Sequence, residues 1–175
     1  MNISKCIQNF ITHLQPNINF QESATKRTFY TYLIWAKFLS QDEKLKITSL
    51  CFLIYSKIGF IFERDSYDYT PFHHALVMDH EKLALQMLML ADSQKFNIWY
   101  ETKIPHEFHW HPLTFFIWKY SDKGFKEGSK AYFILNLLLK LSEAEVILIR
   151  NSHGLSVYEY IVRKVYMNPL ASKKK

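Results

Sequence analysis

A run of histidines near the middle of the chain is the strongest candidate for chemistry. The segment 106–111 reads His-Glu-Phe-His-Trp-His. Zinc proteases place two histidines four residues apart on one helix around a glutamate. Here the residue four after His106 is Trp110, so that motif is absent. On an extended loop His109 and His111 would share one face, and a zinc or copper site centred on His106–His111 therefore stays open as an alternative.

Other catalytic signatures are missing from the sequence. The four glycines are scattered, so there is no glycine-rich phosphate loop, and no G-x-S-x-G segment occurs. Neither Cys6 nor Cys51 stands in a nucleophile signature, and Cys51 lies in an apolar run typical of an inert core thiol. We therefore predict no catalytic residue, no bound metal and no cofactor, and keep an enzyme or metal protein only as the alternative.

The elements that would position any site are predicted to be helices. Of the 175 residues, 49% are hydrophobic and 17% aromatic, which excludes a disordered chain. Only 4 glycines and 5 prolines are present, far fewer turn signals than a β-sandwich needs. Long apolar-periodic stretches with few helix breakers predict an all-α fold.

Charge and hydropathy restrict the partners. The net charge is +6, of which Lys173–Lys175 supply three, and only four of the 22 basic residues are arginine, the residue that reads guanine and phosphate best. Nucleic acid is thus an unlikely partner, although a nucleic-acid or membrane-surface binder using the basic tail is a third hypothesis. The most apolar stretch, Ile47–Phe62, contains Lys57 and is shorter than the roughly 20 residues of a membrane span. We expect no transmembrane segment and a cytoplasmic protein.

The segment 70–75 reads Thr-Pro-Phe-His-His-Ala. It resembles the ankyrin-repeat signature T-P-L-H-x-A, and the resemblance extends over about 25 positions to the turn at Asp79-His80, where the family has Gly-His. The local chemistry agrees with this, because Thr70 suits a helix N-cap and Pro71 a first helical position. The resemblance implies structural roles for Thr70, Pro71, His73, Ala75, His80, Pro112 and Ser156, the two histidines bonding the turns.

The pattern recurs 41 residues later at 111–116 and 45 residues further on at 151–158. We therefore expect a short ankyrin-like helical solenoid with an N-terminal helical cap. The predicted parts are a cap region 1–61, repeats 62–110, 111–150 and 151–167, and a basic tail 168–175. Helices are predicted over 3–13, 28–39, 42–57, 71–78, 81–91, 112–120 and 130–141.

A binding function follows from the resemblance. In ankyrin-like stacks the loops and inner helices form the binding face, and the offsets of 41 and 45 align equivalent positions along it. The residues predicted to contact a partner are Tyr67, Tyr69, His74, Phe108, Trp110, Phe115, Trp118, Lys119, Arg163 and Lys164. The chain also resembles ankyrin-repeat effectors that intracellular bacteria deliver into host cells. This implies a non-catalytic module that binds a host protein or another effector, in the bacterial cytoplasm or the host cytosol.

Overall fold

The computed structural model describes residues 21–55, 61–67, 69–96, 111–120, 123–142, 148, 150, 154–156, 158, 159 and 162. Six helices and no strands lie in these residues, so the all-α class is confirmed. The chain divides into two compact units, Met1–Phe96 and Asn97–Lys175. The predicted helix 3–13, most of the histidine run and the basic tail lie outside the described residues.

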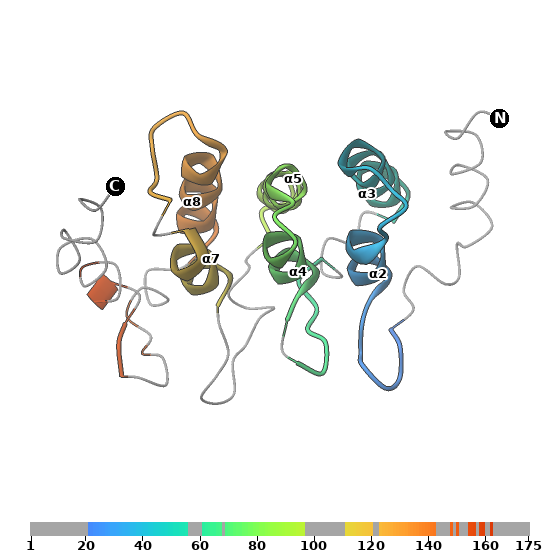
Figure 1. Ribbon diagram of the computed structural model, residues 1–175, viewed down its shortest axis with the longest axis horizontal. Coiled ribbons are helices and arrows are strands. Elements are labelled where there is room, and N and C mark those ends of the chain that lie inside the picture. The colour runs from blue at the N-terminus through green and yellow to red at the C-terminus, as the bar shows by residue number, and fades with distance from the viewer. Residues whose placement is uncertain are drawn as a thin grey trace. The chain divides into compact units, whose positions relative to one another are not determined.

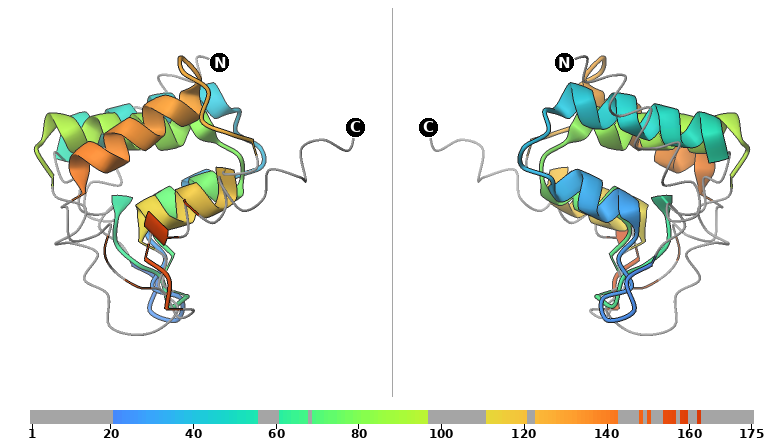
Figure 2. Two further views of the ribbon diagram at one scale, coloured as in Figure 1. Left: turned by 90° about the vertical axis from the view of Figure 1, so that its left-hand side faces the viewer. Right: turned by 90° about the vertical axis from the view of Figure 1, so that its right-hand side faces the viewer.

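The first unit contains two helical pairs (Figure 1). Helices α2 (Phe29–Trp35) and α3 (Gln41–Tyr55) form the first pair. Helices α4 (Pro71–Val77) and α5 (Glu81–Ser93) form the second. Helix α2 packs against α4, and α3 packs against α5, so the two pairs lie side by side in two layers (Figure 2).

Local chemistry explains where α4 begins and ends. The Thr70 side chain accepts from the backbone N–H of His73, and the His73 ring accepts from the backbone N–H of Thr70, so the two form a capping box. Pro71 occupies the first turn, where no amide donor is needed. At the other end Asp79 adopts a φ of +54°, which turns the chain sharply into α5. The predicted cap and turn are therefore both present.

A loop precedes each pair and projects from the helices on the same side (Figure 2). We call residues 21–28 loop 1 and residues 61–70 loop 2. Loop 1 is closed by a bridge between Gln21 and Thr28. Residues 21–55 thus repeat the loop–helix–helix order of 61–93, although the sequence assigned no such loop to the predicted cap region.

The core of the first unit lies between its two layers. Fully buried apolar side chains come from every helix of this unit and from loop 2, and they include Ile34, Cys51, Ile61, Phe62, Phe72, Ala75, Leu76, Ala84, Met87, Leu88 and Ala91. The Phe62 ring packs on Phe72 at 6.1 Å between centroids and stacks on Phe96 at 5.4 Å. Aromatic burial of this kind supplies much of the free energy that holds such short helices together.

The second unit contains one well-described pair, α7 (Pro112–Tyr120) and α8 (Lys130–Leu141), with the bounds predicted from the sequence. The Ser129 side chain caps α8 by accepting from the backbone N–H of Tyr132. The buried Phe116 ring stacks on Tyr120 at 4.7 Å and contacts Phe125 at 5.7 Å. Among the described helices of the chain, none has the length and apolarity to cross a bilayer.

Candidate partner-binding surface

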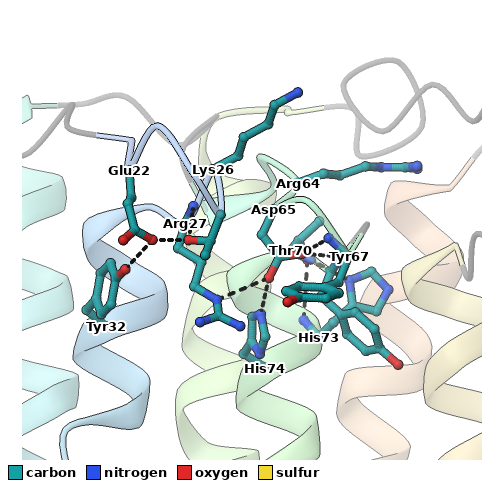
Figure 3. Close-up of polar contacts among 12 residues, drawn as sticks. Glu22, Lys26, Arg27, Tyr32, Arg64, Asp65, Tyr67, Thr70, His73 and His74 are labelled. Atoms are coloured by element: carbon teal, nitrogen blue, oxygen red, sulfur yellow. Dashed lines mark hydrogen bonds and ion pairs between the residues drawn. The ribbon is translucent and has the colours of Figure 1, made fainter.

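Asp65 organises loop 2. Its buried carboxylate accepts from the backbone N–H groups of Tyr67 at 2.9 Å and Tyr69 at 3.0 Å through Oδ1. The second oxygen, Oδ2, accepts from Nε2 of His74 at 2.9 Å (Figure 3). One side chain therefore fixes both the bend of the loop and the position of the loop relative to α4.

Arg27 connects loop 1 to this centre. Its Nε lies 3.6 Å from Oδ2 of Asp65, and its guanidinium carbon lies 4.2 Å from the centroid of the Trp35 ring. The same guanidinium lies 5.6 Å from the centroid of Tyr67. Arg27 is thus placed between an aromatic residue of α2 and one of loop 2, where cation–π attraction favours it.

The two loops also contact one another directly. The backbone N–H of Ser66 donates to the carbonyl oxygen of Thr25 at 2.8 Å. Within loop 1, the carboxylate of Glu22 accepts from the hydroxyls of Thr25 and Tyr32, and these bonds lower the pKa of Glu22. Loops 1 and 2 therefore form one connected surface in the first unit.

A second polar junction joins the pairs at the level of the helix turns. The Nζ of Lys44 donates to the carbonyl oxygen of Ile34 at 2.6 Å and lies 3.2 Å from Nε2 of His80. An ammonium group can only donate, so this contact requires Nε2 of His80 as the acceptor, which a neutral ring protonated on Nδ1 supplies. The amide nitrogen of Gln41 lies 3.1 Å from Nδ1, but it cannot donate to Nδ1 while that atom carries the proton, so the Lys44 contact is the one that defines the junction. His80 therefore bonds a residue of the preceding helical pair, as a structural role requires.

Neutral histidines at these junctions make the fold sensitive to acid. Burial lowers the pKa of His80, and the nearby Lys44 ammonium lowers it further. Burial also lowers the pKa of His74, outweighing the opposite effect of Asp65. A folded-state pKa below the unfolded value of about 6.5 means that the unfolded chain binds more protons, so this contribution to stability is complete above about pH 6.5 and is lost as pH falls below it.

We expect the midpoint of thermal unfolding to be lower at pH 5.5 than at pH 7.5. At pH 5.5 the carboxylates remain ionised, so the difference between the two pH values reports proton uptake by the histidines. His80→Gln should reduce the difference between the two pH values, because its side chain takes up no proton in either state. An unfolding midpoint that fell equally with pH in the wild type and in His80→Gln would contradict the assignment.

Three helices have an exposed apolar residue at the same position along their length. Trp35, Val77 and Trp118 each stand six residues after the first residue of α2, α4 and α7. Their exposed fractions are 38%, 46% and 45%. Each of these helices is the first of a pair, so three corresponding helices present an apolar residue to solvent at the same position.

The predicted contact residues separate into three groups. Tyr67 and Trp118 are exposed, and Tyr69 and Lys119 are half-buried. Phe108, Trp110, Arg163 and Lys164 lie outside the described residues. His74 and Phe115 are buried, which corrects their assignment to the contact surface. His74 is occupied by Asp65, and Phe115 turns inward from the fourth position of α7, a position that faces the interior in α4 as well.

The predicted structural residues have local partners. The contacts of Thr70, Pro71, His73 and His80 are described above. Ala75 is fully buried in α4, and Pro112 is the first residue of α7. Ser156 accepts from the backbone N–H of Glu159 at 3.1 Å, and the Glu159 carboxylate accepts from the N–H of Ser156 at 2.8 Å. That reciprocal pair is the arrangement of a capping box.

Sequence reasoning missed Arg27, Trp35 and Asp65 as members of a surface. A signal was present, because Thr28 precedes Thr70 by 42 residues, close to the 41 that separate Thr70 from His111. Extending the offset backwards would have placed loop 1 before α2 and Trp35 at the position equivalent to Val77. The loop itself has no signature residues, and only its contacts reveal it.

The described residues contain neither a cluster of metal-ligating side chains nor an activated cysteine. Across these ranges, no group of three or more His, Cys, Asp or Glu side chains is placed to hold a metal ion. His111 is buried, and its Nδ1 accepts from the backbone N–H of Leu113 at 3.1 Å at the start of α7. Burial raises the pKa of the Cys51 thiol to about 12, which confirms an inert core cysteine.

Comparison of the chain with family models, curated proteins and solved structures found no match in any of the three.

Proposed function

We propose that the chain is a non-catalytic protein-interaction module of the ankyrin-repeat type. In each unit the binding surface would include the first helix of a pair, and in the first unit it would also include loops 1 and 2. The observation that carries this proposal is that Trp35, Val77 and Trp118 are each exposed at the same position of a helix that begins a pair. Exposed aromatic residues beside an arginine are the composition found at the centres of protein interfaces.

Side-chain contacts, as well as residue types, support the ankyrin-type assignment. In the segment 70–80 the threonine caps the helix, the first histidine completes the capping box, and the last histidine bonds the preceding pair. The acidic residue at the start of the turn, Asp65, accepts the backbone N–H groups that follow it. The residue types of the repeat signature are suited to making these contacts.

The partner we propose is a protein of a host cell, following the resemblance to ankyrin-repeat effectors. Affinity capture with the intact chain as bait in a eukaryotic lysate tests this, with retained proteins quantified by mass spectrometry. Trp118→Ala should reduce retention of a genuine partner by tenfold or more, since truncating a central aromatic costs about 2 kcal/mol or more.

A matched control is available in the same unit. Phe133 lies on α8, the second helix of its pair, and is 51% exposed. Phe133→Ala removes an aromatic side chain of similar exposure from outside the proposed surface, and retention should stay unchanged. Equal loss in both variants, or no protein retained from eukaryotic or bacterial lysates, would refute the proposal.

A further inference from the structure

The guanidinium of Arg27 pairs with Asp65 and lies beside two aromatic rings, but it makes no hydrogen bond to the described residues. The guanidinium carbon lies 4.2 Å from the Trp35 centroid and 5.6 Å from the Tyr67 centroid. Nε lies 3.6 Å from Oδ2 of Asp65, an ion pair beyond hydrogen-bond distance (Figure 3). Nε is buried without a hydrogen-bond partner. Within the ranges that the structure describes, none of the five N–H donors of this guanidinium makes a hydrogen bond. Nε faces Asp65, whereas the Nη donors have no acceptor among the described residues and are left to water or to an acceptor from a partner.

The outer edge of the guanidinium is accessible to such an acceptor. The side chain is 18% exposed, and Nε is its only nitrogen that is buried without a partner, so the two Nη nitrogens reach solvent. The rings beside it are 38% (Trp35) and 64% (Tyr67) exposed. The site therefore presents two outward N–H donors bordered by apolar rings.

The nearby carboxylates are already engaged. Asp65 is buried and accepts from two backbone N–H groups and from His74. The carboxylate of Glu22 accepts from the hydroxyls of Thr25 and Tyr32. Neither carboxylate hydrogen-bonds the two Nη nitrogens of Arg27, whose fork matches the geometry of a carboxylate.

We propose that Arg27 is the specificity-determining anchor of the partner surface, and that it binds an Asp or Glu side chain of the partner protein between Trp35 and Tyr67. An apolar residue beside that acid would pack on the two exposed rings. The net charge of +6 favours encounter with an acidic partner. The inference rests on the proposed interaction function and names the chemistry of its partner.

Selection from a random 12-residue peptide library displayed on phage, with the intact chain as target, tests the inference. Peptides enriched in Asp or Glu beside an apolar residue are expected. The best of them is then compared with its acid-to-amide version by fluorescence polarisation, on the wild type and on Arg27→Gln. The amide version should bind the wild type about tenfold or more weakly, because charge-assisted hydrogen bonds are lost, and Arg27→Gln should bind both peptides almost equally.

Three further variants separate recognition from folding and from net charge. Arg27→Lys keeps the charge but loses the two-nitrogen fork, and should retain little of the preference for acid over amide. Lys46→Gln removes one exposed charge from α3, and should keep the preference intact. If thermal unfolding shows that Arg27→Gln is not folded, Tyr67→Ala removes an exposed ring beside the guanidinium and should weaken the acidic peptide several-fold.

Non-acidic selected peptides, an acid-to-amide effect that persists in Arg27→Gln, or the absence of any enriched peptide would overturn the inference. Its failure can be told apart from failure of the proposed function. A partner captured by the wild type and lost in Trp118→Ala, combined with peptides indifferent to Arg27, would remove only the carboxylate anchor. No captured partner and no enriched peptide would remove both.

Discussion

Replacing Asp65 by alanine is expected to destabilise the protein by about 3 to 5 kcal/mol. The carboxylate is almost fully buried, and four groups depend on it: two backbone N–H groups of loop 2, the ring of His74 and the guanidinium of Arg27. Its removal leaves the partly buried Arg27 cation without its counter-charge and several buried donors without an acceptor, which costs more than the bonds themselves contribute. Urea unfolding followed by circular dichroism measures the loss.

Two variants sharpen this test. Asp65→Asn keeps one oxygen for the loop N–H groups but lacks the charge, and it should lose less stability than the alanine variant. Asp42→Ala removes an exposed carboxylate whose distance from Lys82 is 3.8 Å, and a change of less than about 0.5 kcal/mol is expected. A loss in Asp65→Ala no greater than in Asp42→Ala would show that the carboxylate does not hold the loops.

The second large effect is expected in α7, the helix that carries Trp118. Phe116 is fully buried and stacks on Tyr120. Phe116→Ala should lower the free energy of unfolding by about 3 to 5 kcal/mol, because a buried ring is lost and a cavity remains. The measurement is again urea unfolding, with tryptophan fluorescence as a second probe because Trp118 lies in the same helix.

Phe133→Ala is the control for this loss as well. It removes the same side chain from a position that is 51% exposed, so a change within about 0.5 kcal/mol is expected. If both phenylalanine variants lost similar stability, the assignment of Phe116 to the core and of Phe133 to the surface would be wrong. A stable Phe133→Ala also validates its use as the control in the capture experiment.

Local sequence signals predicted the helices well because helix ends depend on neighbouring residues. The Thr70 cap, Pro71 in the first turn and the turn at Asp79 each act within a few residues. These residue types alone were therefore enough to predict α4 and the start of α5. The bounds of α7 and α8 followed from a proline, a serine cap and apolar periodicity. The all-α class was determined in the same way.

The partner surface was predicted less well, because exposure depends on what packs over a residue. His74 and Tyr32 both stand at the fourth position of a helix that follows a loop, and both bond to an acid of that loop. His74 is nevertheless buried, whereas Tyr32 is 42% exposed. The offset between repeats identifies such positions as equivalent, but it does not say which of them neighbouring loops will cover.

By itself, the sequence determined the helical class, both ends of α7 and α8, the starts of α4 and α5, and the threonine and histidine contacts that stabilise one turn. The predicted helix 28–39 ends at Trp35 in the structure, four residues earlier than its periodicity indicated. Only the tertiary structure decided that Arg27 of loop 1 meets Asp65 of loop 2, that Lys44 bonds His80, and that Trp35 is exposed at the same helical position as Val77. The physical reason is the range of the interactions. Capping and helical periodicity act over a few residues, whereas ion pairs, cation–π contacts and burial join segments that lie far apart along the chain.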